Sequence, residues 1–306
     1  MNALICSGLL VLAAGGTGQG DVTRTLQVDG RERSYLLHVP PSYDPEVPTP
    51  VVLALHGGGT NAEFMRSLSG LNAKSDQAGF LLAYPNGTGA GSRALVWNAG
   101  GVEGQGVDDV KFIAMLLEDL GTTHHVDPLR VFVTGYSNGG MMAYRLATDL
   151  ADRIAAIAPV SGTMTDLEVF APRPVSVIHF HGTADWIVPF FGPGFSVPDF
   201  LVFASVPESM HYWVTRNACP PRPEVENLPD TTDDGTTVRR WSWGPGLLDT
   251  EVVLYAIRRG GHTWPGVPFP LPFLGLTTLD ISANDLMWEF FERHPLPDVV
   301  SYSDPR

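Results

Sequence analysis

The sequence predicts an α/β protein with a doubly wound, mostly parallel sheet and an antiparallel N-terminal edge. Continuous apolar runs such as 50–55 and 80–84 are typical of strands that are buried on both faces of a parallel sheet. Segments of helical composition alternate with these runs along the chain. Ahead of them, Asp29-Gly30 separates two segments that alternate in polarity, which is the pattern of a β-hairpin.

The expected elements follow in chain order. The strands of the hairpin are 23–28 and 33–39, and Pro40-Pro41 ends the second. The other expected strands are 50–55, 80–84, 131–133, 154–160, 175–180, 237–243 and 251–257. The expected helices are 61–79, 108–120, 141–150, 206–217 and 282–293. No repeat or linker divides the pattern, so we expect residues 21–306 to form one domain; the alternative is two halves joined near 163–174.

Composition excludes several classes of function. The chain has 306 residues, 33 of them acidic and 19 basic, and a formal net charge of −14. An acidic chain without a Lys/Arg cluster is a poor candidate for binding nucleic acid or an anionic membrane. No spacing of His, Cys, Asp or Glu typical of a metal site occurs, and no glycine-rich cofactor loop. We therefore expect no cofactor and no metal.

The first 20 residues indicate a signal peptide. They carry no charge, and the apolar run 3–14 is too short to span a bilayer and ends in small residues. A basic residue ahead of the run is missing, so a buried or disordered N-terminal segment is the alternative. The two cysteines are Cys6, inside this segment, and Cys219, which we expect to be a packed thiol.

The sequence Gly135-Tyr136-Ser137-Asn138-Gly139 is the strongest candidate for a catalytic motif. It joins the predicted strand 131–133 to the predicted helix 141–150. A G-x-S-x-G sequence in a strand–turn–helix context is typical of a nucleophile elbow, in which a strained turn exposes the serine hydroxyl. The alternative is an ordinary turn in which Ser137 only caps the helix.

A serine hydroxyl needs a base and an orienting acid before it can attack. In an α/β-hydrolase these follow the nucleophile in the order acid, then histidine, each after a strand. Asp185 and His262 meet this order, after the predicted strands 175–180 and 251–257. Asp166 is the rival acid. His181 precedes Asp185, so we expect it to brace the acid loop by hydrogen bonding.

The negative charge of a tetrahedral intermediate requires N–H donors. We expect one from the backbone of Asn138, which follows the nucleophile. The second should come from His56-Gly57-Gly58-Gly59, with Gly58 the first choice and Gly59 the second. Glycines allow this backbone to approach a substrate closely.

Two apolar loops leave strand ends on the expected catalytic side. One follows Asp185 and the other follows His262. They could wall a hydrophobic cleft, or they could pack into a local core. The residues that we expect to contact the substrate are Tyr136, Trp186, Phe190 and Trp264.

A series of short motifs covers nearly the whole chain after residue 23. They are Leu55-His56-Gly57-Gly58, Tyr84-Pro85-Asn86-Gly87, Trp97-Asn98, Val107-Asp108-Asp109, Gly135-Tyr136-Ser137-Asn138-Gly139-Gly140, His181-Gly182-Thr183-Ala184-Asp185 and Gly261-His262-Thr263-Trp264-Pro265. In this order they resemble the secreted esterases grouped as polyhydroxybutyrate depolymerases, which also include feruloyl and acetylxylan esterases. The resemblance implies a secreted α/β-hydrolase with the triad Ser137–Asp185–His262 and no cofactor.

The sequence departs from this group in three respects, one of which is that its two aromatic loops are longer and more apolar than we expect of the family. Relatives commonly carry a second cysteine near 243–249, and its absence here puts the disulfide of Cys219 in doubt. No separate binding domain follows the catalytic one, which favours soluble or amorphous esters over crystalline polyester. We therefore expect a serine esterase acting on polyester or on aromatic or acyl esters, with feruloyl or acetylxylan esters of plant polysaccharide as the alternative. A serine peptidase and a non-catalytic binding protein remain as rivals, and the oligomeric state is open.

Overall fold

The computed structural model describes residues 20–89, 91–100, 106–193, 202–268 and 271–297. The expected signal peptide therefore lies almost entirely outside the described residues. In the described part of the chain, no helix combines the length and the apolar composition that crossing a membrane requires.

Ten strands form one sheet in the order β1-β2-β4-β3-β7-β8-β9-β12-β11-β10. The strands are β1 (Gly20–Val28), β2 (Arg31–Val39), β3 (Thr49–Leu55), β4 (Leu81–Pro85), β7 (Val126–Tyr136), β8 (Ala156–Val160), β9 (Ser176–Gly182), β10 (Glu224–Asn227), β11 (Thr237–Trp243) and β12 (Val252–Arg258). All neighbouring pairs from β4 to β12 are parallel. Strands β3, β4, β8 and β9 are buried along their whole length, as expected of central strands of a parallel sheet, and β9 buries two histidines along with its apolar residues.

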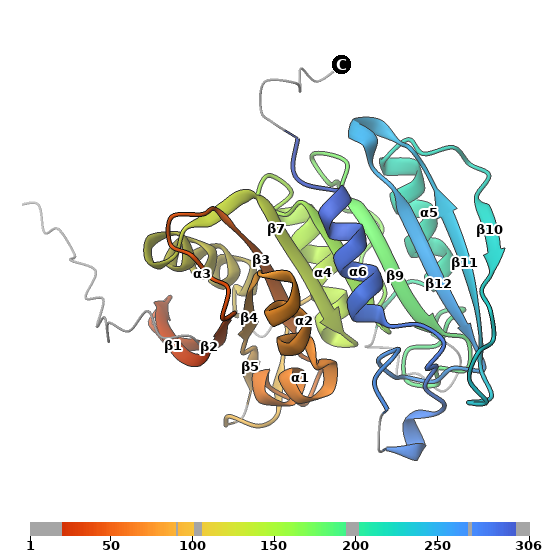
Figure 1. Ribbon diagram of the computed structural model, residues 1–306, viewed down its shortest axis with the longest axis horizontal. Coiled ribbons are helices and arrows are strands. Elements are labelled where there is room, and N and C mark those ends of the chain that lie inside the picture. Colours follow the sequence, from red (N-terminus) through yellow and green to blue (C-terminus); the bar gives the residue numbers. More distant parts are fainter. Residues whose placement is uncertain (1–19, 90, 101–105, 194–201, 269–270, 298–306) are drawn as a thin grey trace, which may run out of the picture.

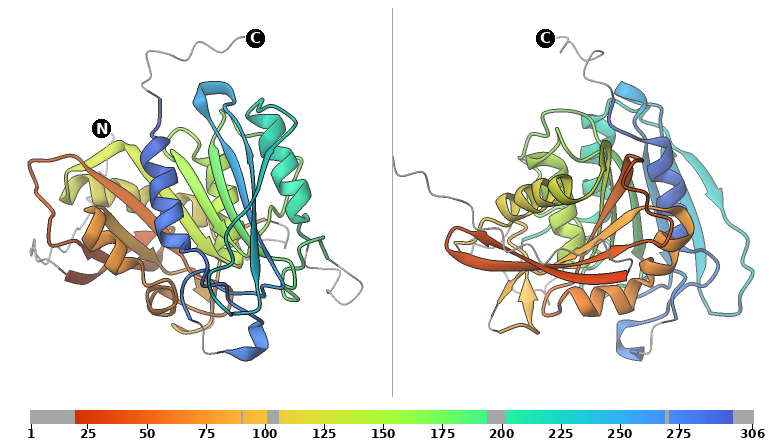
Figure 2. Two further views of the ribbon diagram at one scale, coloured as in Figure 1. Left: turned by 45° about the vertical axis from the view of Figure 1, so that its right-hand side comes forward. Right: turned by 60° about the vertical axis from the view of Figure 1, so that its left-hand side comes forward.

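Helices cover both faces of the sheet (Figures 1 and 2). They are α1 (Ala62–Ser69), α2 (Leu71–Ala78), α3 (Asp109–Thr123), α4 (Asn138–Asp149), α5 (Val206–Arg216) and α6 (Ala283–Arg293). Buried side chains of α3, α4 and α5 join one core cluster, and those of α1, α2 and α6 join the other. The fold is the predicted doubly wound α/β-hydrolase sheet, and that prediction is confirmed.

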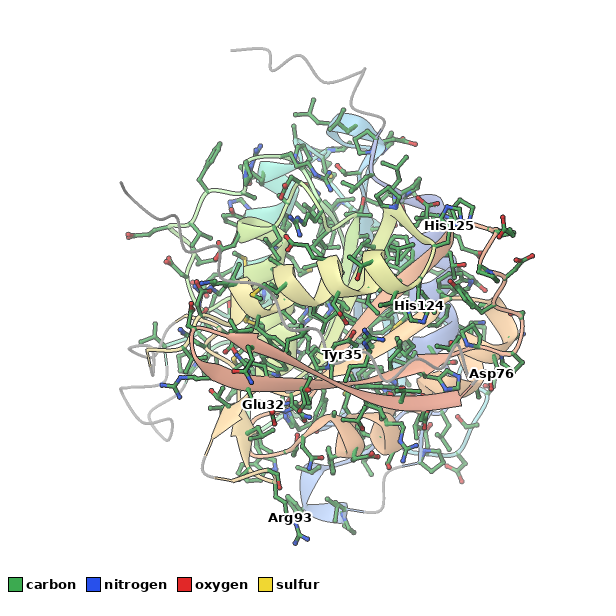
Figure 3. The ribbon with its side chains drawn as sticks, turned by 90° about the vertical axis from the view of Figure 1, so that its left-hand side faces the viewer. Glu32, Tyr35, Asp76, Arg93, His124 and His125 are labelled. Atoms are coloured by element: carbon green, nitrogen blue, oxygen red, sulfur yellow. The ribbon has the colours of Figure 1, made fainter. Side chains whose placement is uncertain are left out.

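The N-terminal hairpin is the predicted antiparallel edge. Residues of β1 and β2 pair in register from Gly20 with Val39 to Val28 with Arg31. Figure 3 looks onto this edge, with α3 lying beside the hairpin and Tyr35 between them. Tyr35 and Arg24 both bond to the Asp119 carboxylate of α3, which ties the edge to the core.

The structure differs from the predicted elements in three places. The expected helix 61–79 is two helices, because Gly70 adopts φ 61° and ends α1 before α2 begins. The loop after β4 contains a short hairpin, β5 (Thr88–Gly89) and β6 (Leu95–Val96). At the C-terminal side β11 and β10 add a second antiparallel edge, which the polar composition of β10 did not indicate.

The parallel strands share one direction, so their carboxyl ends meet at one edge of the sheet, the lower edge in Figure 1. The loops after β3, β7, β9 and β12 carry the motifs of His56, Ser137, Asp185 and His262. The sheet therefore gathers segments from four parts of the chain into one region.

The turn after β7 requires glycine at position 135. A Cβ atom on Gly135 would lie 2.3 Å from the carbonyl oxygen of Gly139, which is backbone and cannot rotate away. We predict that Gly135→Ala lowers the free energy of unfolding by about 3 kcal/mol, through overpacking. Chemical denaturation measures this change.

Gly121→Ala is the matched control. Gly121 lies in α3, and a Cβ there would have no atom within 4 Å. Alanine is the better helix former, so this variant should gain up to about 1 kcal/mol. Equal effects of the two substitutions would contradict the packing account of the turn.

Candidate active site

Ser137 lies at a strained turn between β7 and α4. Its backbone has φ 56° and ψ −120°, a combination that residues with a Cβ rarely adopt. The Ser137 side chain makes no capping hydrogen bond to the helix that begins at Asn138. The alternative that the Ser137 side chain only caps the helix is therefore excluded. The strained strand–turn–helix is the geometry of a nucleophile elbow.

The close approach of three backbones holds this turn. A Cβ on Gly139 would lie 2.3 Å from the carbonyl oxygen of Leu55, and one on Gly162 would lie 2.2 Å from that of Ser137. The N–H of Ser137 donates to the carbonyl of Val160 at 2.9 Å. Segments after β3 and β8 therefore fix the turn from both sides.

Asp185 and His262 form the expected acid–histidine pair. Nδ1 of His262 donates to Oδ2 of Asp185 at 2.7 Å, and both side chains are buried. Oδ1 of Asp185 accepts from the N–H groups of Ile187 and Val188, both at 2.9 Å. With its proton on Nδ1, the neutral imidazole presents Nε2 as an acceptor, which is the tautomer that a general base needs.

Asp185 is held as a carboxylate. Burial opposes its ionisation, but hydrogen bonds from His181 and His262 outweigh burial and hold the pKa of this carboxyl well below its usual range. The charge therefore persists throughout the neutral range, where it can stabilise a protonated His262.

Tyr136 places His262 beside the elbow. The Tyr136 hydroxyl donates to the carbonyl of His262 at 2.6 Å, and the two rings lie 4.8 Å apart. Among the described residues no hydrogen bond joins Ser137 Oγ to His262 Nε2. Such bonds are often long without substrate and tighten in the Michaelis complex.

The loop after β3 lies against the start of α4. A Cβ on Gly58 would lie 3.4 Å from Cβ of Asn138, so the two segments are in contact. No backbone hydrogen bond within the described chain uses the Gly58 N–H, whereas the Gly59 N–H donates to the carbonyl of Leu95 at 2.8 Å. The second choice, Gly59, is therefore wrong, because its donor is already occupied, and Gly58 remains the candidate beside Asn138.

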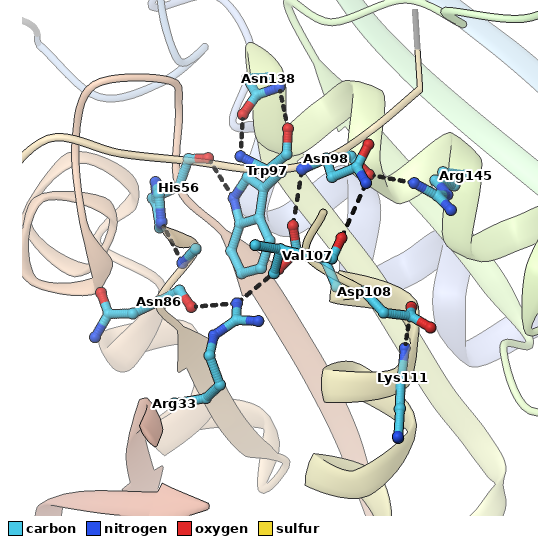
Figure 4. Close-up of polar contacts among 12 residues, drawn as sticks. Arg33, His56, Asn86, Trp97, Asn98, Val107, Asp108, Lys111, Asn138 and Arg145 are labelled. Atoms are coloured by element: carbon cyan, nitrogen blue, oxygen red, sulfur yellow. Dashed lines mark hydrogen bonds and ion pairs between the residues drawn. The ribbon is translucent and has the colours of Figure 1, made fainter. Parts of the chain in front are cut away.

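The Asn138 side chain clamps the segment that packs against this loop (Figure 4). Its Oδ1 accepts from the Trp97 N–H at 2.7 Å and its Nδ2 donates to the Trp97 carbonyl at 3.2 Å. The Trp97 indole N–H in turn donates to the carbonyl of His56 at 3.0 Å. These contacts connect the two candidate oxyanion segments through one tryptophan.

A buried ion pair supports the same segment (Figure 4). Arg33 of β2 bonds to Asp109 at 2.6 Å and to the carbonyl of Asn86 at 3.0 Å. The other oxygen of Asp109 accepts from the Asn98 N–H at 2.8 Å. The sequence motifs Trp97-Asn98 and Asp108-Asp109 marked these positions, but only the folded chain shows that they support the oxyanion loop.

His56 is a structural histidine in this loop. Its Nε2 accepts from the Gly87 N–H at 2.9 Å, so Nδ1 carries the proton and donates to the Gly57 carbonyl at 2.8 Å. Burial lowers the pKa of His56 to about 4, so the ring is neutral at physiological pH.

The four expected substrate contacts have different outcomes. Trp186 is 62 % exposed, and its indole N–H donates to the Phe273 carbonyl at 2.8 Å, which joins the two apolar loops. Trp264 is fully buried and bonds to Asn284, so its prediction as a substrate contact is wrong. Phe190 and Tyr136 are also buried; Phe190 packs against His181, and Tyr136 holds His262. On the described parts of the same two loops, the rings of Phe191 and Phe273 are also exposed.

The rival residues take other roles. Asp166 is exposed and accepts from the backbone of Glu168. His181 braces the acid loop as expected, since its Nε2 lies 2.8 Å from the Val188 carbonyl and 3.4 Å from Oδ2 of Asp185. Cys219 is a free, buried thiol, and burial raises its pKa to about 11. In the described ranges, no group of three or more His, Cys, Asp or Glu side chains is placed to hold a metal ion.

Fold and site together define an α/β-hydrolase with the arrangement of a serine nucleophile. Comparisons with known proteins agree with this class. The sequence model of the prolyl oligopeptidase family matches residues 66–172. This segment contains Ser137 but neither Asp185 nor His262. A solved structure of an acetyl xylan esterase from Aspergillus awamori covers 89 % of this chain and 99 % of its own, with a TM-score of 0.60. At 17 % identity it supports the fold alone.

Sequence relatives identify the family. A protein of Nocardia uniformis subsp. tsuyamanensis, named as the esterase NocK, is 33 % identical over 87 % of this chain and 81 % of its own length. A protein of Aspergillus niger named as feruloyl esterase C is 31 % identical over 87 % of this chain and 85 % of its own. The chain belongs to this feruloyl esterase-like family of carboxylic-ester hydrolases.

The neutral His56 predicts a pH dependence of stability. Its pKa is about 4 in the folded chain and about 6.5 when unfolded. Between these values the unfolded chain binds a proton that the folded chain does not, so stability should fall as pH drops from 6.5 to 4. The contribution of His56 to this loss is up to about 3 kcal/mol.

The variant His56→Gln tests this account. Glutamine keeps an acceptor for the Gly87 N–H but does not titrate. We expect its free energy of unfolding to fall less steeply than that of the wild type between pH 7 and 4.5. Urea denaturation at a series of pH values measures this. If the free energy of unfolding falls equally steeply with pH in the variant and the wild type, His56 does not cause the pH dependence.

Proposed function

We propose that the chain hydrolyses carboxylic esters of aromatic acids, such as ferulate esterified to plant polysaccharide, through an acyl-enzyme on Ser137. The observation that carries the mechanism is the buried Asp185–His262 pair at the end of β9 and β12, beside the elbow at Ser137. The substrate class is inferred from the relative named as a feruloyl esterase. The exposed rings of Trp186, Phe191 and Phe273 on the flanking loops suit an aromatic acyl group.

The mechanism follows from the arrangement of the donors. Ser137 Oγ attacks the ester carbonyl carbon while His262 Nε2 takes the hydroxyl proton, and Asp185 stabilises the resulting imidazolium. The N–H groups of Asn138 and Gly58 bind the oxyanion. His262 returns the proton to the leaving alcohol, and the ester bond breaks. Water then attacks the acyl-enzyme with the same base, which releases the carboxylic acid and restores Ser137.

The names of the relatives favour esters of aromatic acids over polyester as the substrate class. Their similarity extends over 87 % of the chain, so it includes all three triad positions. The match to the prolyl oligopeptidase family ends at residue 172, before Asp185 and His262. It therefore supports a serine peptidase less than the relatives support an esterase. The intact acid–histidine pair and the free Gly58 donor speak against a binding protein without activity.

A panel of esters tests both the mechanism and the substrate class. We predict that the purified protein hydrolyses p-nitrophenyl butyrate and methyl ferulate, and that Ser137→Ala lowers both rates by at least about a thousandfold. Polyhydroxybutyrate film and acetylated xylan are the competing substrates. Release of ferulate by chromatography and of p-nitrophenol by absorbance measure the rates.

The outcomes separate the two parts of the proposal. Wild-type turnover in Ser137→Ala would remove the serine mechanism. Hydrolysis of polyhydroxybutyrate or acetylated xylan with no release of ferulate would leave the mechanism and overturn the aromatic substrate class. Labelling of wild type, but not of Ser137→Ala, by a fluorophosphonate probe confirms the nucleophile independently of substrate.

We also propose that the protein is secreted, because residues 3–14 have the composition of a signal-peptide core and small residues follow them. Expression of the full sequence in a secreting bacterial host tests this. We expect the protein in the medium or periplasm, with its new N-terminus near residue 20 by N-terminal sequencing. Recovery of intact Met1 in the cytoplasm would contradict secretion.

A further inference from the structure

Two histidines and a tyrosine that the triad does not use lie buried between α4 and the acid loop. The hydroxyl of Tyr144 lies 2.8 Å from Nδ1 of His179, and Nε2 of His179 lies 3.0 Å from Nδ1 of His181. None of the three is more than 1 % exposed. His179 and His181 are two positions apart on β9, so their side chains project from the same face of the sheet.

Tyr144, His179 and His181 form a chain of hydrogen bonds whose donors all point the same way. The Val188 carbonyl can only accept, so Nε2 of His181 must carry a proton and donate to it. In a neutral imidazole Nδ1 of His181 is then the acceptor for Nε2–H of His179. Nδ1 of His179 in turn accepts from the hydroxyl of Tyr144. Burial lowers the pKa of His179 and raises that of Tyr144, which keeps both groups neutral.

The last member of the chain reaches the catalytic acid. Nε2 of His181 lies 3.4 Å from Oδ2 of Asp185, the oxygen that also accepts from His262. Its bond to the Val188 carbonyl holds the same loop whose N–H groups donate to Oδ1 of Asp185. The position of the carboxylate therefore depends on the orientation and tautomer of His181.

The first member of the chain lies on the helix of the nucleophile. Tyr144 is in α4, and the residue that precedes α4 is Ser137. The chain thus connects the helix that begins at the nucleophile with the loop that carries the acid, through the interior of the protein. Ring contacts support it, since the rings of His179 and His181 stack at 5.2 Å and Tyr144 stacks on Trp213 at 6.5 Å.

We infer that Tyr144, His179 and His181 form a positioning chain that fixes the Asp185 carboxylate, and through it His262, relative to Ser137. Because every buried donor and acceptor along the chain has a partner, the chain has one favoured arrangement. A displacement of about 1 Å in a catalytic group can lower the rate a hundredfold, so this alignment affects turnover rather than substrate binding. The inference rests on the triad proposed above.

Removal of one hydroxyl tests the chain. Tyr144→Phe keeps the ring but leaves Nδ1 of His179 as a buried acceptor without a donor, so the contact that holds the His179 ring, and through it His181, from the side of α4 is lost. We predict a kcat for p-nitrophenyl butyrate about tenfold lower, with KM within about twofold of the wild type. The matched control is Tyr35→Phe, which removes the hydroxyl of another fully buried tyrosine, one that bonds to Asp119 at the N-terminal edge. The control should keep the wild-type kcat.

Substitutions of His181 test the end of the chain. His181→Phe keeps a ring but removes the donor to Asp185 and Val188, and its kcat should fall about a hundredfold. His181→Gln places an amide N–H near the position of Nε2 and should recover most of the rate. If His181→Phe does not fold, the kcat values of His181→Gln and Tyr144→Phe, compared with that of Tyr35→Phe, still test the positioning chain. Imidazole ¹⁵N spectra should show His179 and His181 of the wild type as Nε2–H tautomers.

Other outcomes would overturn the inference. One is that Tyr144→Phe has the same kcat as Tyr35→Phe. Another is that Tyr144→Phe raises KM while its kcat stays at the wild-type value. An Nδ1–H tautomer at His181 would also contradict the direction of the chain. The test is separate from that of the triad. If Ser137→Ala retains activity the triad fails, whereas an inactive Ser137→Ala with unchanged Tyr144→Phe removes only the positioning chain.

Discussion

The turn at Ser137 is the constraint on which the rest of the site depends. A residue with a Cβ is held at φ 56° and ψ −120°, at a cost of about 1–3 kcal/mol that the surrounding structure must offset. That support comes from backbones that approach within contact of Gly135, Gly139 and Gly162, where a side chain would collide. The same close approach brings the loop of Gly58 against the start of α4. The strain at Ser137 and the contact between Gly58 and Asn138 thus have a common physical origin.

Hydrogen bonds between buried groups fix the acid–histidine pair and the segments around the Gly58 loop. On one side the Asn138 amide, Trp97 and His56 connect the two oxyanion segments. On the other side Asp185 accepts from the loop backbone, from His262 and from His181. A buried polar group without a partner costs 1–3 kcal/mol or more, so such networks favour one arrangement over its alternatives.

Expectations from the sequence failed where burial had to be known. Trp264 and Trp186 each follow one member of the His262–Asp185 pair in an apolar loop, yet Trp264 is fully buried and bonded to Asn284 while Trp186 is exposed. Nothing in the local sequence distinguishes them, because the difference is set by the packing of α6 against the histidine loop. The choice between Gly58 and Gly59 likewise depended on Leu95, a residue of a distant hairpin that accepts from one N–H and not the other.

The sequence by itself determined the sheet and the order in which Ser137, Asp185 and His262 follow its strands, because these depend on periodicity and on local motifs: continuous apolar runs, glycines around Ser137, and polar residues at strand ends. The tertiary structure alone decided which residues near those motifs touch. It split the helix 61–79 at Gly70, added an antiparallel edge of β10 and β11, and joined Tyr144 to Asp185 through two histidines. The bond between Tyr144 and His179 joins positions 35 residues apart, and packing over the whole chain fixes a contact of this kind.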